Sequence, residues 1–429
     1  MRKTISVKGG LNGTVQIPPD KSIAHRAAMF AALADGTSTI GNYAQAADPQ
    51  TTLKVIQALG VAVEQDGTTV KVHGRGRHTL QQPKAEIDCE NSGTTMRLMV
   101  GILSGAGIEC TLTGDASLSR RPMKRVMGPL AQMGAHIDAR EGTYPPLRLH
   151  ANKGLKAIDF VLPIASAQLK SCILLAGLFC DDEVVVRETV RSRNHTEVLL
   201  GLKDELLDDG TRLVYSSRSH QVPLQNYDVP GDFSSAAFWM VAGSIMAEGE
   251  LLLKNVGLNP TRDAALHVLR RMGADIRVIE ERQAGAEVVA DLSVRPARLQ
   301  ATSMSEAEVA VAIDEIPVLS IAMAFAEGES EVRGAGELRV KECDRIDAMA
   351  SMLRAMGIPV QEFEDGYRIE GQPDHRFDSL EADSRHDHRI AMSAAVASVR
   401  CDGEVSIEGA EHAAVSYPDF WNDLDRVMG

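Results

Sequence analysis

The sequence predicts an α/β fold built from six repeated units and divided into two domains. In the clearest repeats a helix ends at a glycine, and a strand, a turn and a second strand follow it. Because units of this kind stack on their neighbours, we expect six units of roughly 70 residues each. Four close copies and one weaker copy place the helix-ending glycine at Gly60, Gly134, Gly273 and Gly357, and at Gly201.

The two ends of the chain are expected to complete the sixth unit together. Leu424 to Gly429 repeats the helix-end pattern, and Thr4 to Val7 and Thr14 to Ile17 match the strands that would follow it. This predicts a discontinuous domain of residues 1–19 and 231–429, and a second domain of residues 20–230. Turn-like, proline-containing crossings are expected at Pro18–Asp20 and Val229–Asp232.

Six predicted helices begin with basic residues, in a place where positive charge is unfavourable. The free N–H groups at a helix start already carry partial positive charge, so Lys or Arg there implies that an anion binds. Arg binds phosphate or carboxylate through two N–H donors. Nearby Ser and Thr side chains cap the helix or donate further hydrogen bonds to the anion. The segments are 20–26, 91–97, 120–124, 165–170, 338–347 and 387–389.

Composition narrows the classes of function. The net charge of −14 disfavours non-specific binding to nucleic acid or anionic membranes, and 4% aromatic residues give little surface for stacking bases. No apolar stretch reaches membrane-spanning length and no secretory signal follows Met1. We therefore expect a cytoplasmic protein with no nucleic-acid or membrane partner.

The motifs for common metal and nucleotide chemistry are missing from the sequence. The six cysteines lack paired or metal-ligand spacing, so we expect buried, reduced thiols. HExxH, P-loop and Gly-x-Ser-x-Gly motifs are also absent. The remaining interpretation is a clamp for polyanionic substrates, with Asp314 and Glu342 as candidate acid–base carboxylates. Asp48 is interpreted as a helix cap, and four histidines as structural or supporting residues: His25, His136, His195 and His267.

The motifs at these helix starts resemble those of the 5-enolpyruvylshikimate-3-phosphate synthase family, and the resemblance covers the whole chain. They are Asp20-Lys21-Ser22 with Arg26, Asn91–Arg97, Arg121-Pro122-Met123, Ser166-Ala167-Gln168, Arg191–Glu197, Arg339–Arg345 and Asp387-His388-Arg389. The resemblance implies the enolpyruvyl transferase fold, a two-domain inside-out α/β barrel of six repeated units with its active site in the interdomain cleft.

The resemblance also implies an activity. The family transfers the enolpyruvyl group of phosphoenolpyruvate to the 5-hydroxyl of shikimate 3-phosphate in the shikimate pathway, which leads to chorismate and the aromatic amino acids. The products are 5-enolpyruvylshikimate 3-phosphate and phosphate, and the path is addition then elimination through a tetrahedral intermediate. We expect a monomer that uses no metal ion and no organic cofactor.

Residue roles follow from the same resemblance. Asp314 is expected to take the hydroxyl proton, and Glu342, with Lys21, to protonate and deprotonate the methylene carbon. Phosphoenolpyruvate is expected to bind Lys21, Gly93, Arg97, Arg121, Gln168, Lys341, Arg345, His388 and Arg389. Shikimate 3-phosphate is expected to bind Lys21, Ser22, Arg26, Ser166, Ala167, Gln168, Arg193, Asp314 and Lys341.

Three positions depart from the best-known members of the family: Leu98, Ala167 and Val415. These departures, together with the sequence Ser192-Arg193-Asn194-His195-Thr196, resemble the class II branch of the family, which is often glyphosate-tolerant. Gly93 is retained, which leaves glyphosate sensitivity open.

Several alternatives stand beside this interpretation. The related UDP-N-acetylglucosamine enolpyruvyl transferases need a Lys-Asn pair and a loop cysteine, whereas this chain has Lys21-Ser22 and no cysteine in residues 114–121. A non-catalytic phosphometabolite sensor would be favoured by loss of Glu342 or Asp314. A nucleic-acid 3′-end processing protein fits the charge of −14 poorly. Glu342 could also serve only as a salt-bridge partner of Arg345.

Overall fold

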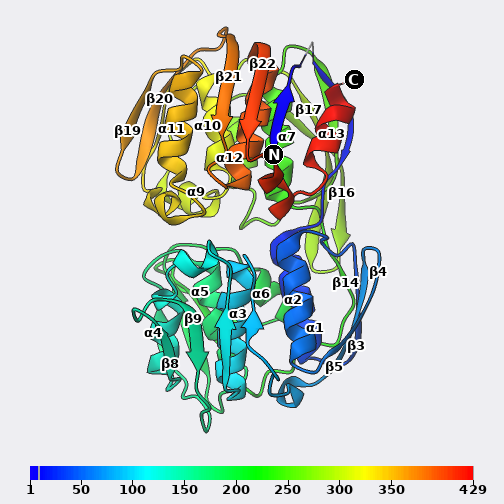
Figure 1. The fold of residues 1–429 in the computed structure, drawn as a ribbon, viewed down its shortest axis with the longest axis vertical. Coiled ribbons are helices and arrows are strands. Elements are labelled where there is room, and N and C mark those ends of the chain that lie inside the picture. The colour runs from blue at the N-terminus through cyan, green and yellow to red at the C-terminus, as the bar shows by residue number, and fades with distance from the viewer. Residues whose placement is uncertain (8–9, 429) are drawn as a thin grey trace. The chain divides into compact units, whose positions relative to one another are not determined.

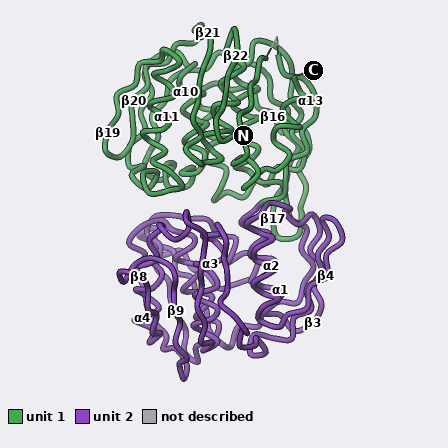
Figure 2. The backbone as a smooth tube through the Cα atoms, viewed as in Figure 1, with its two compact units in different colours: residues 1–20, 230–429 green, residues 21–229 purple. Residues whose placement is uncertain are grey.

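The computed structural model describes residues 1–7 and 10–428. They form two compact units (Figure 2): unit 1 contains residues 1–20 and those from 230 onward, and unit 2 contains residues 21–229. Within the described residues each unit holds three small sheets and three largely buried helices. The fold is therefore α/β with six repeated units, as the sequence predicts.

Unit 2 repeats one sheet order three times: β14-β3-β5-β4, β6-β7-β9-β8 and β10-β11-β13-β12. In each sheet the second strand pairs in parallel with the edge strand before it and antiparallel with the strand after it. The strands are β3 (Asp35–Gly41), β4 (Ala62–Asp66), β5 (Thr69–Arg75), β6 (Ile87–Asp88), β7 (Cys110–Thr113), β8 (Ile137–Arg140), β9 (Tyr144–Leu149), β10 (Asp159–Val161), β11 (Val184–Glu188), β12 (Asp204–Leu206), β13 (Arg212–Ser216) and β14 (Tyr227–Asp228). The buried helices are α1 (Lys21–Leu33), α3 (Gly93–Ala106) and α5 (Ala167–Gly177), and the others are α2 (Ala47–Ala58), α4 (Lys124–Gln132) and α6 (His195–Leu200).

Unit 1 contains the sheets β16-β17-β15-β2, β18-β20-β19 and β1-β22-β21 (Figure 1). Its strands are β1 (Arg2–Ile5), β2 (Leu11–Gln16), β15 (Gly249–Gly257), β16 (Asp275–Ala284), β17 (Glu287–Arg295), β18 (Gly328–Val332), β19 (Val360–Phe363), β20 (Gly366–Gly371), β21 (Phe377–Asp383) and β22 (Cys401–Glu408). The buried helices are α7 (Phe233–Ile245), α10 (Ile316–Ala324) and α12 (His388–Ala397), and the others are α8 (Ala264–Arg271), α9 (Glu306–Val311), α11 (Arg345–Ala355) and α13 (Phe420–Met428).

The predicted helix-ending glycines are confirmed. Gly60, Gly134, Gly201, Gly273 and Gly357 all have positive φ, between 63° and 99°. This left-handed conformation ends the preceding helix and suits glycine, because it has no Cβ. The local repeat can therefore be recognised from sequence wherever a helix must turn back into a strand.

The closure of the sixth unit is predicted only in part. β1 pairs antiparallel with β22 and so completes the last sheet. β2, however, pairs in parallel with β15, which belongs to a different sheet, so the placement of Thr14 to Ile17 in the sixth unit was wrong. Gly429, part of the same helix-end pattern, lies outside the described residues.

Small and aliphatic residues let the buried helices pack closely. All 13 residues of α7 are buried, and α3 packs along α5. At Gly101 of α3 an added Cβ would lie 2.3 Å from the carbonyl oxygen of Cys172 in α5. Only glycine fits this contact, so the helix pair holds its starting residues in fixed positions.

The cysteines and helices give two further findings. All six thiols are free, and five of them are buried, as expected. Over the described part of the chain, no helix combines the length and the apolar character that a membrane span requires.

Candidate active site

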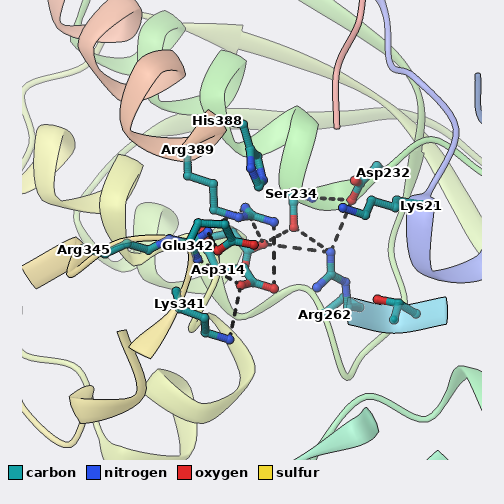
Figure 3. A network of polar contacts seen from close by, with 12 residues as sticks. Lys21, Asp232, Ser234, Arg262, Asp314, Lys341, Glu342, Arg345, His388 and Arg389 are labelled. Carbon is teal, nitrogen blue, oxygen red and sulfur yellow. Dashed lines mark hydrogen bonds and ion pairs between the residues drawn. The ribbon is translucent and has the colours of Figure 1, made fainter. Parts of the chain in front are cut away.

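In unit 1 four segments bring charged side chains together (Figure 3). Asp314 lies in the turn between α9 and α10, and Lys341 and Glu342 follow a 3₁₀ turn. Arg345 is the first residue of α11, and Asp387 caps the N-terminus of α12 by accepting a hydrogen bond from the Arg389 N–H at 2.8 Å.

Arg345 is the centre of this cluster. Its side chain is 1% exposed, and its Nε and Nη2 donate to the two oxygens of Asp387 at 2.8 and 3.3 Å. Nη2 also donates to Glu342 Oε2 at 2.7 Å, and Nη1 to Asp314 Oδ1 at 3.4 Å. Burial works against the charge, but the three carboxylates outweigh it and raise the pKa of Arg345, so the guanidinium stays positive.

Asp314 has three cationic neighbours. Arg345 Nη1 lies 3.4 Å from its carboxylate, Arg389 Nη2 lies 3.8 Å from it, and Lys341 Nζ lies 3.9 Å from it. Arg389 also donates from Nη1 to the Asp314 carbonyl oxygen at 2.8 Å, which fixes both residues. The cluster can therefore bind an anion beside a carboxylate that is positioned to accept a proton.

His388 lies at the edge of this cluster. It is 4% exposed, and its Nδ1 lies 3.9 Å from Asp387 Oδ1.

A second buried network, which no sequence motif indicated, lies beside Asp314. Arg262 is 3% exposed and donates from Nη2 to Ser234 Oγ at 2.7 Å and to Asp232 Oδ1 at 3.3 Å. Ser234 in turn donates to Glu315, the neighbour of Asp314 in sequence. The available sequence signal covers Glu315 alone, as the second member of the charged pair Asp314-Glu315 inside an apolar stretch.

This second network contains a carboxyl group with a perturbed pKa. Burial, and then the charge of Asp20, raise the pKa of Asp232 from 3.8 to about 6, although Arg262 and Arg389 oppose the shift. Asp232 also caps α7, since its Oδ1 accepts from the Ser234 N–H at 2.9 Å.

In unit 2 the starts of α3 and α5 form a basic cluster. Ser92 caps α3, and the guanidinium groups of Arg97 and Arg121 lie next to Gly93, because an added Cβ there would meet their Nη1 atoms at 2.8 and 3.4 Å. Arg97 Nη1 donates to Gln168 Oε1 at 3.0 Å. The helix N-terminus and two guanidinium groups make this place suitable for a phosphate or carboxylate.

Neighbouring side chains hold this cluster in place. Arg121 Nη2 donates to Asn91 Oδ1 at 2.9 Å and to Ser117 Oγ at 3.1 Å. Gln168 donates from Nε2 to Thr94 Oγ1 at 3.0 Å. The guanidinium groups of Arg97 and Arg121, which would donate to a bound anion, are therefore oriented before any ligand binds.

The start of α1 contains the remaining basic residues of unit 2. Lys21 Nζ pairs with Asp48 Oδ2 at 2.6 Å, so Asp48, interpreted from sequence as a helix cap, is a charge partner. Arg26 is 3% exposed and donates to Thr196 Oγ1, the Ser22 carbonyl and Ser171 Oγ at 2.8, 3.0 and 2.8 Å. It thereby ties α1 to α5 and α6.

A buried ion triad supports the loop that carries Arg193. Lys170 in α5 has 0% exposure and contacts Glu188 Oε1 at 3.0 Å and Glu197 Oε1 at 2.7 Å. Glu188 also accepts from the Ser192 N–H at 2.8 Å. Arg193 follows Ser192 directly in the chain, and Lys170 lies in α5, the helix that Ser166 caps just before Ala167. The triad therefore holds the segment with Arg193 against the helix that begins at Ala167.

Comparison with known proteins identifies the family of the chain. The family model for EPSP synthase (3-phosphoshikimate 1-carboxyvinyltransferase) matches residues 5–424. A 3-phosphoshikimate 1-carboxyvinyltransferase of Salinibacter ruber is 47% identical over 430 residues, which cover 100% of this chain and 99% of the relative. One of Solibacter usitatus is 44% identical, with 100% of both chains covered.

Solved structures of other proteins also resemble this chain. An EPSP synthase from Acinetobacter baumannii is 40% identical with a TM-score of 0.87, covering 100% of this chain and 98% of that one. The enolpyruvyl transferase NikO from Streptomyces tendae shares the fold, with a TM-score of 0.74 at 19% identity over 99% of this chain and 96% of that one. On the family match and the full-length identity, this chain belongs to the EPSP synthase family.

Proposed function

We propose that this chain is a 3-phosphoshikimate 1-carboxyvinyltransferase of the shikimate pathway. It transfers the enolpyruvyl group of phosphoenolpyruvate to the 5-hydroxyl of shikimate 3-phosphate and releases phosphate. The observation that carries the proposal is the grouping of Lys341, Arg345 and Arg389 within 4 Å of Asp314 in a chain of this family. Such a cluster supplies an anion site and a proton acceptor together.

The carboxylates of unit 1 have separate roles in the proposed reaction. Asp314 accepts the proton of the 5-hydroxyl group while the hydroxyl oxygen attacks C2 of phosphoenolpyruvate. Glu342, with Lys21 sharing the step, protonates the methylene carbon in the addition and removes a proton from the resulting methyl group as phosphate leaves. Two carboxylates in different surroundings can divide acid and base work in this way.

Arg345 links binding to this chemistry. In the structure its Nη2 donates to Glu342 Oε2 at 2.7 Å. An anionic substrate that binds Arg345, Lys341 and Arg389, with His388 close by, competes for the guanidinium and weakens its hold on Glu342. Glu342 is then free to act on the methylene carbon of the substrate.

The residues of unit 2 bind the two substrates in this proposal. Arg97, Arg121 and Gln168, with the start of α3 at Gly93, hold phosphoenolpyruvate. Shikimate 3-phosphate is held by Lys21, Ser22, Arg26, Ser166, Ala167, Gln168 and Arg193, together with Asp314 and Lys341 of unit 1. The burial of Arg26 among Thr196, Ser171 and Ser22 makes it the residue whose direct contact most needs a test.

The proposal assigns one reaction to residues from both units. Both sets are needed for the same pair of substrates, one from the domain of residues 1–19 and 231–429 and one from the domain of residues 20–230. We also propose a monomeric, cytoplasmic enzyme of the class II branch, supported by Leu98, Ala167 and Val415 at the departing positions.

The test is phosphate release from phosphoenolpyruvate, measured with purified protein and no added metal ion. Release that depends on shikimate 3-phosphate, with 5-enolpyruvylshikimate 3-phosphate identified by mass spectrometry, is the expected result. Release that depends on UDP-N-acetylglucosamine would transfer the chain to the sister activity. Folded protein that releases no phosphate with either acceptor would contradict the proposed function.

A further inference from the structure

Two histidines and an aspartate meet on the β8–β9 hairpin of unit 2, and none of the three has a role in the proposed reaction. β8 and β9 pair antiparallel, with Ile137 opposite Leu149 and Asp138 opposite Arg148. The His150 N–H donates to the His136 carbonyl at 3.0 Å, so these two residues face each other across the strands. Side chains alternate along a strand, and the partly buried Ile137 and buried Leu149 take the core side.

His136, Asp138 and His150 are therefore neighbours on the outer face. His150 Nε2 lies 2.7 Å from Asp138 Oδ2, and His136 Nε2 lies 3.4 Å from Asp138 Oδ1. The imidazole rings stack with centroids 4.4 Å apart and planes 19° from parallel. One ligand atom from each residue lies within 4.8 Å of the other two.

These separations are close to those that a tetrahedral metal ion requires. With bonds of about 2.05 Å, ligand atoms around Zn²⁺ lie about 3.3 Å apart. The two measured nitrogen–oxygen separations, 2.7 and 3.4 Å, lie on either side of that value, so small side-chain rotations bring the atoms into place. The backbone hydrogen bonds between β8 and β9 hold the three residues at fixed positions on the hairpin.

The charges around the cluster also suit a cation. Asp138 is the acidic member of the cluster, and its carboxylate lies within 3.4 Å of a ring nitrogen of each histidine. Arg148 is the cross-strand neighbour of Asp138, but its Nη2 lies 3.6 Å from Glu109 Oε1. The charge of Arg148 is therefore partly offset by Glu109.

We propose that His136, Asp138 and His150 form a surface site for a divalent transition-metal ion of the Zn²⁺ type. Two imidazole nitrogens and one carboxylate oxygen suit Zn²⁺, Ni²⁺, Cu²⁺ or Co²⁺ and not Mg²⁺ or Ca²⁺, which prefer oxygen ligands throughout. Water completes the coordination, since three protein ligands leave a position open. The bound ion bridges the two strands and stabilises the folded hairpin.

The chain offers a matched control. His386 Nδ1 and His412 Nε2 lie 2.9 Å apart in unit 1, with ring centroids 4.9 Å apart. Over the described residues, this second pair belongs to no group of three close metal-ligand side chains. A site that needs the third ligand will bind more tightly at His136, Asp138 and His150 than at this pair.

The experiment is calorimetric titration of the chelator-treated full chain with ZnCl₂. We expect one saturable site with a Kd of about 1–100 µM. His136→Ala with His150→Ala weakens that binding about 10-fold or more, and Asp138→Asn weakens it to a smaller degree. The control, His386→Ala with His412→Ala, binds Zn²⁺ as the parent does.

A second readout uses thermal unfolding. Zn²⁺ at saturating concentration raises the Tm of the parent and of the control variant, and raises the Tm of the His136/His150 variant by a smaller amount. MgCl₂ at the same concentration shifts none of them. No saturable binding by the parent, or equal binding by the His136/His150 variant, overturns the proposal.

Discussion

Arg345 Nη2 lies 2.7 Å from Glu342 Oε2, and the arginine side chain is 1% exposed. The contact fits either a structural salt bridge or a catalytic carboxylate held ready for substrate. If the contact served only as a salt bridge, its loss would change stability and leave turnover nearly intact. A catalytic acid–base group contributes roughly 10²–10⁴-fold to turnover, so the two roles differ widely in their predicted effects.

Replacing Glu342 therefore separates these roles. We expect Glu342→Gln to lower kcat for phosphate release roughly 10²–10⁴-fold while Tm changes little. Glu404→Gln, at an exposed position on β22, is the control and should leave both quantities unchanged. If the variant kept near-parental kcat, Glu342 would have only the structural role of a salt-bridge partner of Arg345.

Gly93 is predicted to control the fit of phosphoenolpyruvate. In Gly93→Ala the new Cβ meets Arg97 Nη1 at 2.8 Å and Arg121 Nη1 at 3.4 Å, so these flexible groups must move. We expect KM for phosphoenolpyruvate to rise roughly 10- to 100-fold, since small displacements of binding groups have effects of this size. Steady-state kinetics with both substrates varied measures it.

The control for this change is Gly128→Ala in α4, where an added Cβ meets no atom within 4 Å. It should keep parental kinetics and gain about 0.4–1 kcal/mol of stability. Equal KM values for the two variants would show that space at Gly93 does not matter for binding.

Lys170 is predicted to be essential for the stability of unit 2. Lys170→Met leaves Glu188 and Glu197 buried without their cation, which costs about 3–5 kcal/mol. Lys54→Met breaks a pair with Glu90 whose side chains are 65% and 40% exposed, and should cost at most about 1 kcal/mol. Urea unfolding measures both, and similar losses would contradict the assignment of the triad as a buried support.

Asp232 gives the protein a predicted pH dependence of stability. Its pKa is about 6 in the folded protein against 3.8 for a free carboxyl, so between these values the folded state binds more protons than the unfolded state. Stability from this group therefore falls as pH rises from 3.8 to about 6.

The variant Asp232→Asn lacks this titration. The free energy of unfolding of the parent, relative to the variant, should decrease by on the order of 1–3 kcal/mol across that range. Thermal unfolding of both proteins at several pH values measures the difference. Parallel curves would show that Asp232 has the same pKa in the folded and unfolded states.

The parts of the fold and site that could be predicted are those determined by local sequence. A glycine that ends a helix, as at Gly134, is required by backbone conformation within a few residues. Likewise, Ser92 before α3 and Asp387 before α12 are capping residues whose partners lie two or three positions away. Because each of these signals is local, the amino-acid sequence alone is enough to place these helix ends.

The parts that could not be predicted depend on contacts between distant segments. Asp387 binds Arg345 from 42 positions away, and Asp48 binds Lys21 from another helix. Arg262 has no local sequence signal, because its partners Asp232 and Ser234 lie 30 and 28 positions away. The error in placing β2 has the same origin, since an edge strand carries no sequence mark of which sheet it joins.

The pairing of β1 with β22 has a consequence for synthesis on the ribosome. Arg2 pairs with Glu408, which emerges roughly 400 residues later. At about 5–20 residues per second, β1 waits roughly 20–80 s for its partner, while the contiguous unit 2 is already complete. Arg2 and Lys3 give the waiting strand a positive charge that discourages pairing with other nascent chains. The order of translation therefore makes unit 2 the first part of the protein able to fold.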